Sequence, residues 1–130
     1  MNYILFHIPH ASLKIPKLFW NVCIKDSNYI KNSNIFLSDY LVDKLIPTNS
    51  HKIIFKYSRL FCDVEKFKDD SKEYMSKIGM GAIYTNDCNG VITKPNNKYK
   101  KKVIKSYYDK YHNKLNKLVT NILKNNNKCI

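Results

Sequence analysis

The sequence predicts an α/β domain in which helices flank a mainly parallel sheet. We expect a three-layer domain that is truncated. Short apolar runs rich in β-forming residues alternate with segments of helical periodicity, in the order strand, helix, strand, helix, strand, helix. The last helical segment is long enough for a crossover, and the first apolar residues of a further strand, Cys129 and Ile130, follow it. We therefore expect residues 1–130 to form one domain that is incomplete at its carboxyl end.

The first half of the chain predicts two strands with a helix between them. Residues 2–8 are an apolar run ended by Pro9, typical of a buried strand, and two prolines make residues 9–20 a loop. Asn34 is suited to cap a helix over residues 35–46 that Pro47 ends. Residues 52–57 are typical of a second strand.

The second half predicts extended chain, a short helix, a short strand and a long helix. Asp69 or Asp70 is suited to cap a helix over residues 71–78, which Gly79 ends, and residues 79–85 then form a turn and a short strand. Residues 99–124 form an amphipathic helix, because one apolar stripe runs through Val103, Tyr107, Tyr111, Leu115, Leu118 and Ile122.

Composition excludes several classes of protein. Apolar residues make up 44% of the 130, which is too many for a disordered chain. No run approaches the ~18 consecutive apolar residues of a membrane-spanning helix, and the first residues do not resemble a signal peptide. The four cysteines form no CxxC pair, which indicates free thiols in a reducing compartment, so we expect a cytoplasmic protein without membrane contact.

The net charge of +13, from 23 Lys and Arg against 10 Asp and Glu, raises the alternative of a non-catalytic basic protein that binds nucleic acid or a protein partner. The lysines are spread along the whole chain, in the company of many Asn, Ile and Tyr residues. This distribution favours a biased genomic composition over a selected binding patch. A decayed or split gene product without activity is a third alternative.

Histidines and acidic residues form the first candidate site. His7 and His10 bracket Ile8-Pro9 at the end of the first strand. An α/β sheet binds ligands beyond the carboxyl ends of its strands, and a neutral imidazole there is placed to hold a metal. Asp39 and Asp43 lie four residues apart on the expected helix, so they share a face that a cation would neutralise. The plainer interpretation gives both aspartates ordinary surface roles.

The second candidate is Arg59, the only arginine in the chain. Its planar guanidinium can hold a carboxylate through two bonds, which lysine cannot do. If residues 59–65 are extended, Arg59 shares a face with Asp63 and Glu65, while Cys62 lies on the opposite, apolar face. This charged face either shapes a pocket or lies in solvent.

Five stretches in order together resemble the N-formylglutamate amidohydrolase family, whose fold is similar to that of zinc exopeptidases. They are FHIPHAS with IP (6–12, 15–16), SDYLVDKL (38–45), YSRLFCDVEKFKDD (57–70), EYMSKIGMGAIYT (73–85) and YYDKYHNKL (107–115). The resemblance runs over nearly the whole chain, and residues 58–85 are its most specific part.

The resemblance implies a hydrolase that uses a bound divalent metal, expected to be zinc, to cleave the carbon–nitrogen amide bond of a small acyl amino acid such as N-formylglutamate. It makes His10 the first metal ligand and Asp39 or Asp43 the acidic ligand. It makes Arg59 the clamp for the substrate carboxylate, with Asp63 and Glu65 holding the arginine and the pocket wall.

The chain departs from the family pattern at three places. Lys66 stands where the family has arginine, and Lys110-Tyr111-His112 stands where it often has Pro-His-His. The family also continues into a strand and an Asp-Cys-His-Ser-type segment with a further metal-site histidine, and this sequence stops before it. We therefore expect little hydrolysis by the chain alone, low solubility or self-association, and possible completion of the site by a second chain.

Overall fold

The computed structural model describes residues 3–91, 93 and 97–130. Strands β1 (Leu5–Ile8) and β2 (His51–Ile54) pair in parallel, with Leu5 opposite His51 and Ile8 opposite Ile54. This confirms the mixed α/β class and the parallel pairing. Both strands are shorter than predicted, and Asn2, which belonged to the first expected strand, lies outside the described residues.

The helices are α1 (Lys17–Trp20), α2 (Ser27–Leu37), the 3-10 helices η1 (Val42–Lys44) and η2 (Tyr74–Ile78), α3 (Asn97–Val103), the π-helical η3 (Ile104–Tyr108) and α4 (Asp109–Asn126).

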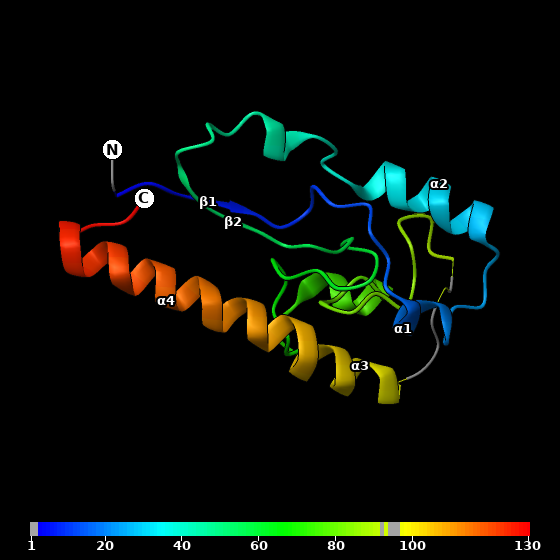
Figure 1. Ribbon diagram of the computed structural model, residues 1–130. Helices are drawn as coiled ribbons and strands as arrows, with labels where there is room; N and C mark the ends of the chain where they lie inside the picture. Colours follow the sequence, from blue (N-terminus) through cyan, green and yellow to red (C-terminus); the bar gives the residue numbers. More distant parts are fainter. Residues whose placement is uncertain (1–2, 92, 94–96) are drawn as a thin grey trace.

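The predicted carboxyl-terminal helix is confirmed as one long rod made of α3, η3 and α4, which runs along the sheet (Figure 1). Its aromatic stripe builds the core through edge-to-face contacts. The ring of Tyr107 lies 4.8 Å from that of Phe61, and Tyr111 lies 5.2 Å from Phe55. These contacts fix residues 55–61 between the rod and the rest of the chain.

The helix expected over residues 35–46 is wrong. Helix α2 begins eight residues earlier, because the side chain of Asp26 accepts hydrogen bonds from the N–H groups of Asn28 and Tyr29. It ends at Leu37, and Leu41 then adopts a left-handed conformation with φ of 69°, which breaks any helical continuation. Asn34, the expected cap, is instead a buried member of α2 whose side chain donates to the carbonyl of Leu13 at 2.8 Å.

Two shorter elements also differ from the prediction. The expected helix over residues 71–78 is only the 3-10 turn η2, capped by the side chain of Glu73 instead of Asp69 or Asp70. Gly79 ends it in the left-handed conformation as expected, with φ of 80°. Residues 79–85 make a turn without a strand.

The last residues return to the sheet. The N–H of Leu5 donates to the carbonyl of Ile130 at 2.7 Å, and the N–H of Ile130 donates to the carbonyl of Tyr3 at 2.8 Å. Ile130 therefore lies beside residues 3–5 at the start of β1 (Figure 1). None of the described helices has the length and apolar character needed to cross a bilayer.

Candidate functional site

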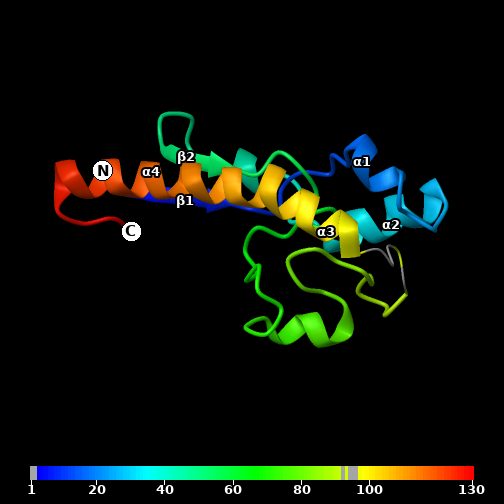
Figure 2. The ribbon, with the colours of Figure 1, turned by 90° about the horizontal axis from the view of Figure 1, so that it is seen from below.

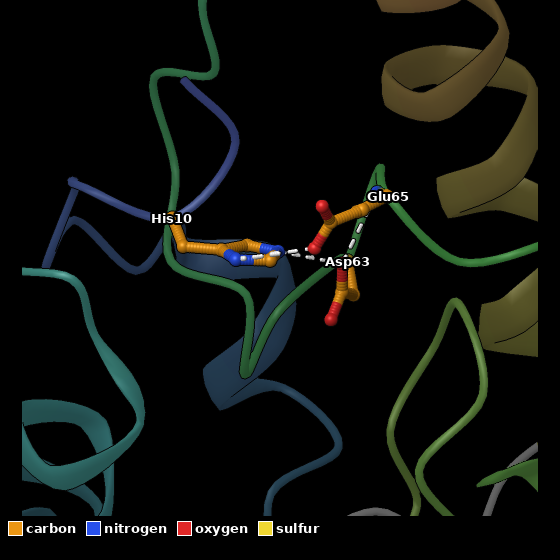
Figure 3. Close-up of side chains that lie close together, drawn as sticks. All are labelled: His10, Asp63 and Glu65. Atoms are coloured by element: carbon orange, nitrogen blue, oxygen red, sulfur yellow. Dashed lines mark hydrogen bonds and ion pairs between the residues drawn. The ribbon is translucent and has the colours of Figure 1, made fainter. Parts of the chain in front are cut away.

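The site begins at His10, two residues after the end of β1. The imidazole is 3% exposed, and its Nε2 lies 2.8 Å from Oδ1 of Asp63 (Figure 3). The carbonyl of His10 accepts a hydrogen bond from the N–H of Asp39 at 3.1 Å, which brings the segment after α2 to the end of β1. The strand end and two distant segments thus converge on one histidine.

Asp63 is the centre of the site, and it is completely buried. Its Oδ1 also accepts from the N–H of Glu65 at 3.1 Å. Its Oδ2 accepts from Nε of Arg59 at 3.2 Å, from Nη2 of Arg59 at 2.9 Å and from the hydroxyl of Tyr84 at 3.0 Å. A buried carboxylate with this set of donors is held in one position.

The extended conformation expected for residues 59–65 is wrong. The N–H groups of Phe61 and Cys62 both donate to the carbonyl of Ser58, so the chain turns at this point. The turn brings Arg59 to Asp63 at a spacing of four residues, as on a helix, while Phe61 and Cys62 are both fully buried. The expected contact between Arg59 and Asp63 is present, whereas Glu65 forms no ion pair with Arg59 among the described residues.

The charges of this network are mutually stabilised. Burial raises the pKa of the Asp63 carboxyl, but the hydrogen bond and attraction of His10 and the attraction of Arg59 outweigh it and leave the pKa below its ordinary value. Burial lowers the pKa of Arg59, and the attraction of Asp63 reverses this and raises it. Asp63 is therefore an anion and Arg59 a cation at neutral pH.

The other ring nitrogen of His10 faces two carboxylates. Nδ1 lies 3.5 Å from Oδ2 of Asp39 and 3.6 Å from Oε2 of Glu65, and both acidic side chains are 60% exposed. His10, Asp63 and Glu65 each offer one ligand atom within 4.8 Å of the others, which is a spacing that suits a metal ion (Figure 3). The arrangement thus offers an imidazole and acidic oxygens at one partly open point.

Asp43 is not part of this cluster among the described residues. Its Oδ2 lies 3.7 Å from Nζ of Lys44, and Asp39 and Asp43 share no helical face because Leu41 reverses the backbone between them. Asp39 reaches His10 through its backbone bond, not through the expected helix.

The remaining histidines near the site have packing contacts. The ring of His7 lies 5.7 Å from that of Tyr111, and burial lowers the pKa of His7. His112 stacks on Tyr108 at 4.2 Å, and its Nε2 lies 2.8 Å from the carbonyl of Val64. His112 therefore ties the rod to the segment that carries Asp63 and Glu65.

Tyr84 is the member of the site that sequence reasoning missed. Its hydroxyl donates to Asp63, its side chain is fully buried, and burial together with the negative charge of Asp63 raises its pKa. Nothing in the local pattern of residues 79–85 distinguishes it from an ordinary core tyrosine. Its place follows from the bond between the N–H of Asp63 and the carbonyl of Ala82 at 2.7 Å.

Comparisons with known proteins point to one family. The family model for N-formylglutamate amidohydrolase matches residues 3–130. The structure resembles the crystal structure of N-formylglutamate amidohydrolase from Ralstonia eutropha JMP134, with a TM-score of 0.79 and 15% sequence identity. The match covers 98% of this chain and 51% of that one, so this chain spans about half the length of the solved protein. A comparison with curated proteins found no match.

Proposed function

Because the chain belongs to the N-formylglutamate amidohydrolase family, as the match over residues 3–130 shows, we propose that it carries part of a metal-dependent site that hydrolyses a small N-acyl amino acid. In the N-formylglutamate type of reaction, water adds across the carbon–nitrogen bond, with its hydroxyl on the formyl carbon and a proton on the nitrogen. The products are formate and glutamate.

The observation that carries this proposal is the bond between His10 Nε2 and Asp63 Oδ1. A buried carboxylate that accepts from one ring nitrogen orients the imidazole and leaves the other nitrogen as a metal ligand. In His10 that other nitrogen is Nδ1, which faces Asp39 and Glu65. The tautomer is assigned here from the hydrogen-bond partners of the ring.

The donor set fits a divalent metal of the zinc type. One imidazole and two carboxylates are ligands that zinc accepts, and the 60% exposure of Asp39 and Glu65 leaves room for their oxygens to adjust and for water to enter. The Asp63 carboxylate already accepts from Arg59, Tyr84 and the N–H of Glu65, so we assign it the positioning of His10 instead of direct ligation. A bound metal would lower the pKa of water and polarise the formyl oxygen.

Arg59 supports recognition of a carboxylate. Its guanidinium is anchored to Asp63 through Nε and Nη2, and the side chain is 20% exposed. Arginine has five N–H donors in a fixed plane, so donors remain for a substrate carboxylate beyond those that Asp63 accepts. A small ligand held there lies close to the point where His10, Asp39 and Glu65 meet, because Asp63 joins Arg59 and His10 directly.

Substrate binding is the direct test. We expect N-formyl-L-glutamate to bind the zinc-loaded chain at one site in a calorimetric titration. Arg59→Lys should weaken binding at least tenfold, because the charge remains but the planar fork is lost. N-butylformamide, which has the formamide but no carboxylate, should not bind measurably. Equal binding of both ligands, or an unchanged affinity for N-formyl-L-glutamate in Arg59→Lys, would contradict the role given to Arg59. Formate release is measured in the same samples.

A further inference from the structure

A hollow of about 400 Å³ lies between β2 and the rod, a volume within the range of small-molecule sites. The rod covers one face of the sheet, and β2 emerges along its side (Figure 2). Residues 53–57 line the hollow from the strand, and residues 106–114 contribute side chains from the rod. The lining includes none of the residues of the cluster around His10, so a ligand here would be additional to the proposed substrate.

Four aromatic side chains in mutual contact line the hollow. The ring of Phe55 lies 5.8 Å from that of Tyr57 and 5.2 Å from that of Tyr111, and the rings of Tyr57 and Tyr107 lie 5.2 Å apart. All three contacts are edge to face, so each ring is held by its neighbours. Such rings lose little conformational freedom when a ligand binds. The hollow therefore suits a ligand that carries an aromatic group.

Three lysines, Lys56, Lys110 and Lys114, line the hollow together with these rings. No Asp or Glu is among the described residues of the lining, and the three ammonium groups form no ion pair with any described acidic side chain. Lys110 and Lys114 lie four residues apart on α4, so their charges share a face and repel each other. An anion bound between them would relieve this repulsion. A phosphate dianion suits three cations better than a single carboxylate does, and lysine binds phosphate as a point charge.

The hydroxyl of Tyr111 is an independent sign of a ligand. Tyr111 is only 8% exposed, and its hydroxyl oxygen is buried without a hydrogen-bond partner among the described residues. Buried hydroxyl groups in folded proteins are nearly always hydrogen-bonded, because an unpaired one has lost its water and gained nothing in exchange. Since Tyr111 lines the hollow, an acceptor atom of a ligand there is the partner that this hydroxyl lacks.

We propose that the hollow between β2 and the rod binds a small aromatic phosphate. Its ring packs against the rings of Tyr107 and Tyr111, and the Tyr111 hydroxyl donates to a polar atom of the ligand. Its phosphate is held by Lys56, Lys110 and Lys114, whose exposed side chains place it at the open side of the hollow. The proposal does not rest on the hydrolase function.

The test is a calorimetric titration of the full chain with adenosine monophosphate, which carries both an aromatic base and a phosphate. Adenosine lacks the phosphate and ribose 5-phosphate lacks the base, so each should bind at least about tenfold more weakly. The double variant Lys110→Gln with Lys114→Gln should weaken binding of adenosine monophosphate by about tenfold or more, because two of three cations are lost. Lys101→Gln with Lys124→Gln is the matched control. It removes the same charge more than two helical turns away along the rod, where salt screens it, so the affinity should change by less than about twofold.

Three results would overturn the proposal. They are no binding of adenosine monophosphate by the unaltered chain, equal affinity for adenosine monophosphate and ribose 5-phosphate, and equal weakening in the two double variants. The last two would show that a basic surface attracts any anion. Tyr111→Phe removes only the hydroxyl and should weaken binding by about threefold or more, and an unchanged affinity would overturn the role given to this hydroxyl. The four substituted lysines are exposed, so these variants are expected to fold, which calorimetric unfolding checks.

Discussion

Substitution of Asp63 by Asn is expected to be the most destabilising conservative change in the site. Asn keeps the shape of the side chain but replaces one acceptor oxygen by an N–H donor. Both oxygens of Asp63 face donors, with the N–H of Glu65 on Oδ1 and the guanidinium of Arg59 on Oδ2. In either orientation the new amide group meets a donor, and Arg59 loses its buried counter-ion.

The magnitude follows from the burial of this pair. Removing one partner of a buried ion pair typically costs about 3–5 kcal/mol, because the other charge remains without compensation. For 130 residues the entropy of unfolding is about 270 cal/mol/K at roughly 2.1 cal/mol/K per residue, so a loss of ~3 kcal/mol lowers Tm by about 11 °C. Calorimetric unfolding at neutral pH measures this shift.

A matched control is Asp109→Asn, which removes the exposed ion pair of Asp109 with Lys68. Exposed pairs contribute about 0–1 kcal/mol, so its Tm should change by less than about 4 °C. The double variant Arg59→Met with Asp63→Asn should recover part of the loss, since no buried cation is then left alone. If Asp63→Asn melts as close to the unaltered chain as Asp109→Asn does, the buried network does not stabilise the fold and our argument is refuted.

Two further predictions concern the segment around residues 79–90. Burial raises the pKa of Asp87, but the hydrogen bond from Tyr29 and backbone donors lower it below its ordinary value. Asp87 therefore stabilises the fold at pH values above the unfolded pKa of about 3.9. This stability is lost as pH falls through the lower pKa of the folded state. Asp87→Asn should therefore be less stable than the unaltered chain at pH 7 and should lose less stability on acidification. Urea titrations at pH 7 and pH 3 measure the free energy of unfolding of both proteins. Equal losses of this free energy between the two pH values would contradict the prediction. Gly79→Ala should lower the free energy of unfolding by more than ~1 kcal/mol, because φ is 80° and an added Cβ would collide with the side chain of Asn86. Gly90→Ala is its control, with φ of 75° and open space around the added atom, so only the backbone strain applies; equal losses would show that the collision is relieved.

Much of the fold could be predicted because it depends on local pattern. The periodic stripe through Val103 and Tyr111 identified the long helix, and the apolar runs identified both strands. The helix predicted over residues 35–46 does not form, for two local reasons. Asp26 caps an earlier helix, and the left-handed Leu41 interrupts the apolar spacing that suggested a later one.

The site could be predicted only as a set of candidates. His10, Asp39, Arg59, Asp63 and Glu65 are brought together by the structure, but the contacts that join them are not written in local spacing. Asp63 bonds to a histidine 53 residues away and to a tyrosine 21 residues away. Asp43 was a reasonable candidate only on a helix that does not form.

A zinc titration of the chain, followed by calorimetry, tests the central claim most directly. The account predicts one zinc ion per chain, loss of this binding in His10→Gln, and unchanged binding in His51→Gln, which alters an exposed histidine of β2. It also predicts that Asp63→Asn weakens binding by about 10- to 100-fold, because the carboxylate that orients His10 is lost. Binding that persists in His10→Gln, or no binding by the unaltered chain, would contradict a metal site at His10.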